Sequence, residues 1–311
     1  MEYFIGVDGG GTKTAFLLGN GAGDVLERLE LQGSSYRQWG TRGTAELLAR
    51  GVSELLTRRG VTPAQVCGAT MGLPCYGENE KIDQELATEL QRRFSPMPLF
   101  LVNDVVVGWA GSLKLQPGIN IVAGTGAIAY GQNMQGETAR CGGWDEFFSD
   151  EGSCYWLGRK TMELFSKQAD GRLPKGALYR IVWEHFNLEH DYQFIEKVIP
   201  EVSSRRDAVA KLQVLLEKAA LEGDGTATAA YEAATEELAM TVRGVKDALR
   251  MEAGCKVSYS GGLFRAGDLI LKPFGERLAA MGCLLTQPCL PPVDGALLLA
   301  RKEFGRNSGN T

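Results

Sequence analysis

Histidine, proline and paired cysteines are scarce in this chain of 311 residues. There are two histidines, His185 and His190, so metal sites or catalytic triads built on histidine are nearly excluded. The seven cysteines include no Cys-x-x-Cys pair, and an odd number of thiols is more typical of a reducing compartment than of a disulfide framework. Eleven prolines without a Gly-X-Y period exclude collagen and proline-rich low complexity.

Long apolar runs and basic blocks are missing as well. No stretch approaches about 18 consecutive apolar residues, so no membrane span is expected. Asp8 ends the short apolar run near the start, and no basic region precedes that run, which argues against a signal peptide. Together with the cysteine usage, this predicts a cytoplasmic protein. The net charge of −5 makes a nucleic-acid partner unexpected.

Glycine, in contrast, is abundant. Its 40 residues are about 13% of the chain, close to twice the roughly 7% of average usage. Hydrophobic residues make up 44% and charged residues 23%, an ordinary globular composition. The surplus therefore predicts many tight turns and places where the backbone approaches another group closely. The length is near the size at which chains divide into two domains.

The first hundred residues predict a mixed sheet covered by helices. Strands are expected over 3–8, 14–18 and 25–31, joined by glycine-rich turns into a meander. Dinucleotide fingerprints and P-loops instead need a glycine loop that opens a helix, and here Thr12 also separates Gly11 from Lys13. Helices and strands then alternate, with helices over 44–59 and after Asn79, and strands over 66–73 and 99–102.

The opening pattern returns later in the chain. A strand over 119–123, the turn Gly124-Thr125-Gly126 and a strand over 127–130 form a weak internal repeat, which predicts two domains of related topology. Residues 150–253 are predicted to be mostly helical. A strand over 256–260 then meets Gly261-Gly262, and a closing helix is expected over 295–304.

The sharpest motif is Asp-Gly-Gly-Gly-Thr-Lys-Thr at residues 8–14. A turn of three glycines can aim consecutive backbone N–H groups at an anion, with the Thr12 hydroxyl beside them. Asp8 can hold a hydrated Mg²⁺ next to phosphates. The alternative is a glycine-rich turn with no ligand. Gly124-Thr125-Gly126 has the same two interpretations and gains weight as the counterpart of the first loop.

Asp104 follows an apolar strand, where open α/β sheets bind ligands. A carboxylate there can accept a hydroxyl proton during phosphoryl transfer, or Asp104 can be the N-cap of the next helix. The block Gly142-Gly143-Trp144 with residues 149–153 is either a binding loop or acidic residues beside a helix dipole. Gly261-Gly262, taken alone, is only a turn.

In this order the motifs resemble N-acetylglucosamine kinase-like proteins, which belong with the BadF/BadG/BcrA/BcrD-type ATPases of the actin/hexokinase/Hsp70 superfamily. The resemblance implies an α/β fold of two ribonuclease-H-like (actin-like ATPase) domains with an ATP cleft between them, the second domain helix-rich. The first domain would comprise residues 1–115 joined by the C-terminal helix 296–305. The second would comprise residues 116–295 with a helical insertion.

The resemblance also implies an ATP-dependent kinase of a small sugar, N-acetylglucosamine or glucosamine, which uses ATP and Mg²⁺ and forms a homodimer. Asp104 would be the general base, and Asp8 would hold Mg²⁺ through water. The phosphates would lie on Gly10, Gly11, Thr12, Lys13, Gly124, Thr125 and Gly126, the adenosine near Gly261 and Gly262, and the sugar near Ser35, Asp104, Gly143, Trp144 and Asp150.

Four departures from the family's pattern leave other functions open. Ala127-Ile128 replaces Ser-Asn after the second loop, no Asn follows Ser34-Ser35, Gly72-Leu73-Pro74 stands where Ser-Gly-Gly is usual, and Asp145 follows Trp144 in place of Gly. Three of these touch the expected sugar pocket. The alternatives are a nucleotide- or sugar-sensing protein without turnover, and an ATPase activator of an electron-transfer enzyme, whose cluster cysteine is missing from residues 119–123.

Overall fold

The computed structural model describes residues 2–203 and 205–305, which form two compact α/β units. Unit 1 comprises residues 2–116 and 287–305, and unit 2 comprises the described residues of 117–286. Each unit is built on a five-stranded sheet, ordered β3-β2-β1-β4-β5 in unit 1 and β10-β9-β6-β7-β8 in unit 2. Within each unit the strands follow the order third, second, first, fourth, fifth, counted along the chain. The expected repeat of topology and the two-sheet α/β fold are therefore confirmed.

The sheet of unit 1 contains the predicted meander. Its strands are β1 Tyr3–Gly9, β2 Lys13–Asn20, β3 Val25–Gln32, β4 Val66–Leu73 and β5 Leu99–Asn103. β1, β2 and β3 pair antiparallel, whereas β4 pairs parallel with β1 and with β5. The carboxyl ends of β1, β4 and β5 therefore meet at one edge of the sheet, where ligands of α/β proteins bind.

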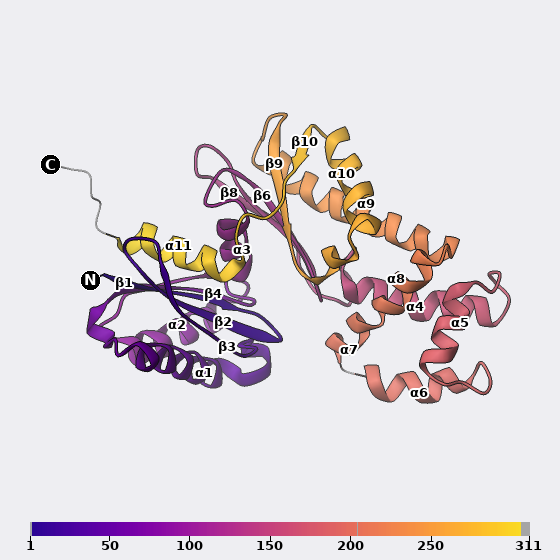
Figure 1. Ribbon diagram of the computed structural model, residues 1–311, viewed down its shortest axis with the longest axis horizontal. Coiled ribbons are helices and arrows are strands. Elements are labelled where there is room, and N and C mark those ends of the chain that lie inside the picture. The colour runs from indigo at the N-terminus through magenta and orange to yellow at the C-terminus, as the bar shows by residue number, and fades with distance from the viewer. Residues whose placement is uncertain (1, 204, 306–311) are drawn as a thin grey trace. The chain divides into compact units, whose positions relative to one another are not determined.

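Helices cover both faces of this sheet (Figure 1). They are α1 Tyr36–Arg59, the 3₁₀ helix η1 Pro63–Gln65, α2 Glu80–Phe94, α3 Asp104–Ser112 and α11 Pro292–Phe304. The predicted helix 44–59 is the second part of α1, which is broken at Gly40 (φ 66°). The apolar periodicity starts only after that break, which explains why the sequence showed the shorter helix. Asn79 caps α2 as predicted, and its side chain accepts the Ile82 N–H.

Alternate residues of β1 divide between the two faces. Ile5 and Val7 are buried in the core formed with α1 and α2, while Phe4 is buried against α11. A Cβ on Gly6 would lie 2.4 Å from the backbone N of Leu297, so α11 rests directly on the strand backbone. This close packing joins α11 to the first strand of the sheet.

The chain returns to unit 1 at residue 287, before the expected residue 296. The Cys289 N–H donates to the Ser112 carbonyl (2.9 Å) and the Leu290 N–H to the Gly111 carbonyl (3.2 Å), both at the end of α3. The Thr286 N–H still donates to Val257 of unit 2 (2.8 Å). These hydrogen bonds attach the segment ahead of α11 to unit 1.

The sheet of unit 2 repeats this arrangement. Its strands are β6 Gly118–Ala123, β7 Ala127–Gln132, β8 Thr138–Gly142, β9 Cys255–Ser260 and β10 Cys283–Leu285. β6, β7 and β8 pair antiparallel, and β9 pairs parallel with β6 and with β10. The loops after β6 and β9 therefore lie at the same edge of the sheet.

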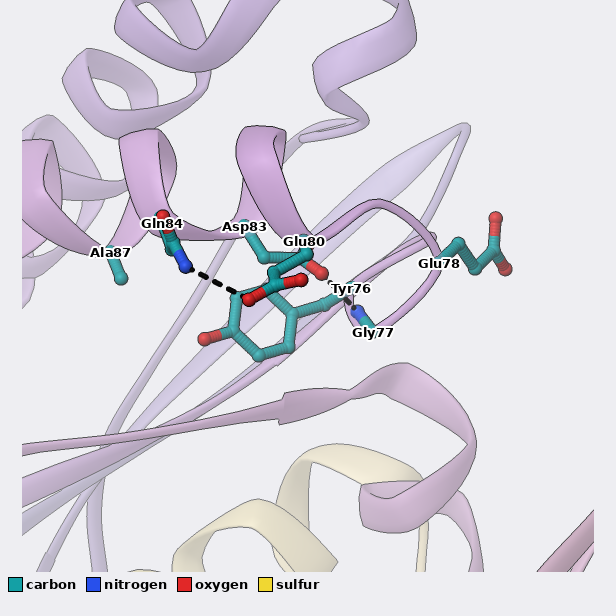
Figure 2. Close-up of a pocket in the computed structure, with 7 residues that line it drawn as sticks. All are labelled: Tyr76, Gly77, Glu78, Glu80, Asp83, Gln84 and Ala87. Atoms are coloured by element: carbon teal, nitrogen blue, oxygen red, sulfur yellow. Dashed lines mark hydrogen bonds between the residues drawn. The ribbon is translucent and has the colours of Figure 1, made fainter.

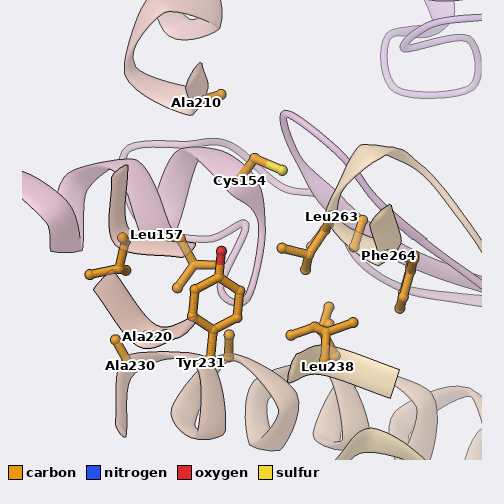
Figure 3. Packing of buried hydrophobic residues seen from close by; sticks show 14 of the residues in the cluster. Cys154, Leu157, Ala210, Ala220, Ala230, Tyr231, Leu238, Leu263 and Phe264 are labelled. Carbon is orange, nitrogen blue, oxygen red and sulfur yellow. The ribbon is translucent and has the colours of Figure 1, made fainter. Parts of the chain in front are cut away.

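Helices dominate the rest of unit 2, as predicted. They are α4 Cys154–Ala169, α5 Ala177–His185, α6 Gln193–Val202, α7 Arg206–Lys211, α8 Gln213–Leu221, α9 Gly225–Ala248, the 3₁₀ helix η2 Gly262–Ala266 and α10 Asp268–Ala280. Figure 3 shows Tyr231 of α9 among apolar side chains such as Leu157, and its hydroxyl donates to Gln213 Oε1 (2.6 Å). Among the described helices, none combines the length and apolar character needed to cross a membrane.

Candidate active site

The glycine-rich hairpin between β1 and β2 is held firmly in unit 1. The Gly10 N–H donates to the Lys13 carbonyl (2.9 Å), which leaves Gly11 and Thr12 exposed at the tip. The Ser34 N–H donates to the Gly10 carbonyl (3.0 Å), so the segment after β3 runs beside the turn. The tip is thus a fixed loop rather than a free one.

Protein packing requires glycine at some positions of this hairpin but not at all of them. A Cβ on Gly9 would lie 2.5 Å from Ser34 Oγ, and one on Gly10 would lie 3.0 Å from the Lys13 carbonyl oxygen. A Cβ on Gly11 would meet no atom of residues 2–203 and 205–305 within 4 Å, and its φ lies outside the left-handed region. Packing therefore explains Gly9 and Gly10 but not Gly11, whose bare backbone is open to a ligand.

Asp8 and Asp104 form an acidic pair at the carboxyl edge of this sheet. Asp8 pairs with Gly72 of β4 in the strand register, and Asp104 opens α3 directly after β5. Burial, together with the negative charge of Asp104, raises the pKa of Asp8 to about 7, although Lys13 opposes the shift. Burial also raises the pKa of Asp104 to about 6, with a further increase from Glu78 and an opposing effect of the Val105 N–H. Raised carboxyl pKa values in one cluster are characteristic of functional sites.

The helix after Asp104 is capped by its neighbour. Asn103 holds the N-cap position, where its Oδ1 accepts the Val105 N–H (3.2 Å) and its Nδ2 donates to the Tyr76 carbonyl (2.7 Å). The alternative that Asp104 is the N-cap is therefore wrong. Asp104 lies in the first turn of α3, where a carboxylate is favoured by the helix dipole.

Polar groups from two other loops lie near this pair. Ser35 precedes α1 and is buried, but its side chain makes no capping hydrogen bond. Ser34 Oγ is buried and has no hydrogen-bond partner among the described residues, although a buried hydroxyl normally has one. In the loop after β4, Glu78 forms an ion pair with Arg37 (3.2 Å). Unit 1 thus brings Ser35 and the acidic pair onto neighbouring segments, with the Ser34 hydroxyl next to Gly9.

A separate hollow lies beside the start of α2 (Figure 2). Its polar groups largely bond to each other: the Gly77 N–H donates to Asp83 Oδ2 (3.0 Å), and Gln84 Nε2 donates to Glu80 Oε1 (3.2 Å). The lining residues are Tyr76, Gly77, Glu78, Glu80, Asp83, Gln84 and Ala87, and no predicted site residue is among them. We do not assign the reaction to this hollow.

Unit 2 brings its two predicted glycine loops together. The loop Gly124–Gly126 joins β6 to β7, and the Cys154 N–H donates to the Gly124 carbonyl (2.8 Å). The nearest atom to a Cβ on Gly124 would be the backbone N of Gly262, at 3.8 Å. Gly262 has no protein atom near its Cβ position, whereas Gly261 (φ 106°) packs against the Ala123 carbonyl. Gly124 and Gly262 therefore present open backbone, as Gly11 does, and Thr125 is exposed beside them.

Asp150 supports the Gly124–Gly126 loop from inside unit 2. Its side chain is 3% exposed, its Oδ1 accepts the Ala127 N–H (3.0 Å), and its Oδ2 pairs with Arg206. Burial raises the pKa of Asp150, while the Ala127 N–H and Arg206 oppose the shift. A Cβ on Gly126 would lie 2.6 Å from Arg206 Nη2. Arg206 was missed by the sequence analysis because it lies 56 residues from Asp150 and in no motif.

The Gly143-Trp144 segment is mainly exposed. Gly142 and Gly143 adopt φ of 78° and 68°, so these glycines are required by the backbone itself. Trp144 is 75% exposed and is followed by the exposed Phe147 and Phe148. The structure of unit 2 therefore places Trp144 on a surface loop. Across the described ranges, no group of three or more His, Cys, Asp or Glu side chains is arranged to hold a metal ion by itself.

Comparison with curated proteins finds sugar kinases that are similar to this chain. The chain is 27% identical to an N-acetylmuramic acid/N-acetylglucosamine kinase of Clostridium acetobutylicum over 253 residues, which cover 81% of this chain and 82% of that protein. It is 27% identical to an N-acetyl-D-glucosamine kinase of Dictyostelium discoideum, with 96% and 97% of the two chains covered.

Solved structures give the same fold. A provisionally assigned N-acetylglucosamine kinase from Chromobacterium violaceum superimposes with a TM-score of 0.76 at 27% identity, covering 96% of this chain and 98% of that one. The sequence profile of the BadF/BadG/BcrA/BcrD ATPase family matches residues 5–300. This match spans both units and every glycine loop described above, and the chain therefore belongs to the BadF/BadG/BcrA/BcrD ATPase family.

Proposed function

We propose that this protein is an ATP-dependent kinase that phosphorylates a hydroxyl group of a small amino sugar, N-acetylglucosamine or glucosamine. The observation that carries the proposal is the position of Asp104 beside Asp8, at the carboxyl edge of the unit 1 sheet. Asn103 is the N-cap of α3, so the Asp104 carboxylate is not needed for that role. With a pKa raised to about 6, Asp104 is mostly ionised at neutral pH and is still basic enough to accept a proton.

The open backbone fits the phosphates of ATP. We assign the phosphates to Gly10, Gly11, Thr12 and Lys13 in unit 1 and to Gly124, Thr125 and Gly126 in unit 2, and the adenosine to Gly261 and Gly262. Backbone N–H groups in such loops bind anions without the steric cost of a side chain. Gly11, Gly124 and Gly262 support this assignment, because no contact in the described part of the chain requires glycine at these three positions.

Asp8 is the carboxylate best placed to hold Mg²⁺ through water. When bound there, the cation would neutralise phosphate charge. The raised pKa of Asp8 fits a site built for a cation, because a nearby positive charge would favour the ionised carboxylate. The other groups of unit 1 act on the sugar: Asp104 orients the acceptor hydroxyl and takes its proton while the oxygen attacks the γ-phosphorus and the bond from that phosphorus to ADP breaks.

The sugar pocket is assigned to Ser35, Asp104, Gly143, Trp144 and Asp150. Ser35 supports this role because it is buried and its hydroxyl makes no hydrogen bond that caps α1 in the described part of the chain. Asp150 has both oxygens engaged by Ala127 and Arg206, so it shapes the sugar pocket indirectly, through the Gly124–Gly126 loop and Arg206. The substrates named for the relatives from Clostridium acetobutylicum and Dictyostelium discoideum support an amino sugar here. A cytoplasmic location and a homodimer complete the proposal.

The test is ADP release with Mg-ATP across hexoses, hexosamines and their N-acetyl forms, with the phosphorylated product identified by mass spectrometry. The proposal expects at least one amino sugar to raise ADP release well above the background ATPase rate and to gain one phosphate. If no sugar does so, the kinase proposal fails. Calorimetry on the same panel then detects a sensor that binds sugar without turnover, and iron analysis detects an electron-transfer activator.

A further inference from the structure

Two cysteines face each other in unit 2, away from the glycine loops. Cys255 is the first residue of β9 and Cys283 is the first residue of β10, and the two pair directly in the parallel register. Their sulfur atoms are 3.2 Å apart. Each cysteine follows a left-handed glycine, Gly254 (φ 85°) and Gly282 (φ 71°), and the Gly254 N–H donates to the Gly282 carbonyl (2.6 Å). The thiols therefore lie side by side because β9 and β10 are neighbours and each begins with a cysteine that follows a glycine.

The two thiols differ in access and in acidity. Cys255 is partly exposed, whereas Cys283 is buried. A hydrogen bond from the Cys283 thiol lowers the pKa of Cys255 to about 7, and the charge of Lys246 adds to this effect. The same contact raises the pKa of Cys283. Cys255 is therefore the thiolate that a reagent from solvent can reach, and Cys283 is the thiol behind it.

We propose that Cys255 and Cys283 form a reversible oxidation site that takes a hydroperoxide and closes to a disulfide. The Cys255 thiolate attacks the terminal peroxide oxygen, the O–O bond breaks, and Cys255 becomes a sulfenic acid. The other oxygen leaves as hydroxide, or as alkoxide from an organic hydroperoxide, and takes a proton from solvent. The Cys283 sulfur then attacks the Cys255 sulfur, the S–S bond forms, the S–O bond breaks, and water leaves with the Cys283 proton. The two sulfurs supply the two electrons that reduce the peroxide, and a thiol reductant restores the dithiol.

The fold allows this bond at little cost. Neighbouring strands lie about 4.8 Å apart, which is within the Cα separation that disulfides span. The bond would close a ring over residues 255–283 that contains Gly261, Gly262, η2 and α10. β10 is a three-residue strand at the edge of the sheet, so the new bond would join it covalently to β9. The proposal rests on the thiol geometry and is independent of the proposed kinase activity.

The experiment treats the fully reduced protein with one equivalent of hydrogen peroxide, blocks the remaining thiols with N-ethylmaleimide and maps peptides without reduction. We expect the thiol count of the denatured protein to fall from seven to five, with a peptide that links Cys255 to Cys283. Dithiothreitol should restore all seven thiols. Cys283→Ser should stop at a Cys255 sulfenic acid that dimedone traps, and Cys255→Ser should not react.

The control is Cys289→Ser, which removes an exposed cysteine and should give the same cross-linked peptide. Initial oxidation of Cys289 or another cysteine, or sulfinic acid at Cys255 with Cys283 still free, would overturn the proposal. Because the cross-link is mapped in the unmodified protein, the test does not depend on whether the variants fold.

Discussion

Burial and, after it, the negative charge of Asp104 raise the pKa of Asp8, so the two carboxylates at the ends of β1 and β5 are coupled. Both carboxylates lower the stability of the folded protein when they are ionised, because burial disfavours their charged form. Carboxylates with raised pKa values at one edge of a sheet are characteristic of functional sites, and both carboxylates here are partly exposed.

Replacement of Asp8 by Asn should stabilise the protein in a pH-dependent way. The pKa of Asp8 is about 7 in the folded protein against 3.8 as its ordinary value, so its ionisation destabilises the fold progressively from about pH 4 to pH 7. Asp8→Asn removes this cost, and because Asp8 is partly exposed we expect a gain of about 2 kcal/mol at pH 8 and little change at pH 4. Urea unfolding of both proteins at the two pH values measures the change in the free energy of unfolding. An equal change at both pH values would contradict the raised pKa of Asp8.

The pH dependence of catalysis should report the same carboxylates. The general base must be ionised, so kcat/KM should fall as the pH drops through the raised pKa values of Asp104 and Asp8, about 6 and about 7. We expect a limb with an apparent midpoint between these values, at least tenfold per pH unit below it, and a plateau above pH 7.5. A rate that stays level down to pH 5 is incompatible with a base in this environment.

Substitution of Gly11 separates ligand approach from packing. Gly11→Ala meets no protein atom, so the melting temperature should stay within about 2 °C while the affinity for ATP falls tenfold or more. Gly225→Ala is the matched control, since its Cβ is also unopposed but Gly225 begins α9 and should leave ATP binding unchanged. Gly33→Ala should instead lower stability, because its Cβ would lie 2.2 Å from the Gly11 carbonyl oxygen. Calorimetric titration and thermal melts distinguish these outcomes, and unchanged ATP affinity in Gly11→Ala would refute the loop assignment.

The Asp150–Arg206 pair should stabilise the second glycine loop. Asp150→Asn keeps the acceptor for the Ala127 N–H and tolerates the left-handed backbone (φ 61°), but it leaves Arg206 without its buried partner. We expect a loss of about 1–2 kcal/mol in the free energy of unfolding, since Arg206 is partly exposed. Arg206→Gln should cost about as much, and the double variant little more than either one. Additive losses in this double-mutant cycle would show that the two residues act separately.

Much of the fold follows from the sequence because its signals are local. Glycine-rich turns between short apolar runs predicted the first meander and the pair β6 and β7 of the second, but not β8. Asn79 predicted the start of α2. The start of α1 was missed because Gly40 interrupts the helix before its apolar face begins. Asn103 and Asp104 are both good capping residues, so only the structure decides that Asn103 has this role.

The glycine surplus has a second cause that the sequence could not reveal. Several glycines serve the packing of α11 rather than any ligand loop. A Cβ on Gly295 would lie 2.2 Å from the Val107 carbonyl oxygen, and one on Gly111 would lie 2.4 Å from the Pro291 carbonyl oxygen. These contacts join residues far apart in the chain and leave no local pattern. Arg206 could not be predicted for the same reason, because its partner Asp150 lies 56 residues away in the chain.

The most direct test of the central claim is single-turnover phosphoryl transfer from Mg-ATP to N-acetylglucosamine or glucosamine by the wild-type protein and by Asp104→Asn. ATP affinity is measured on the same samples, and Asn103→Ser, which weakens the helix cap but keeps the carboxylate, is the control. We predict that Asp104→Asn lowers the transfer rate by about three orders of magnitude or more, while ATP affinity changes less than about threefold and Asn103→Ser remains active. Equal losses of transfer and ATP affinity, or an active Asp104→Asn, would contradict the role of Asp104 as the general base.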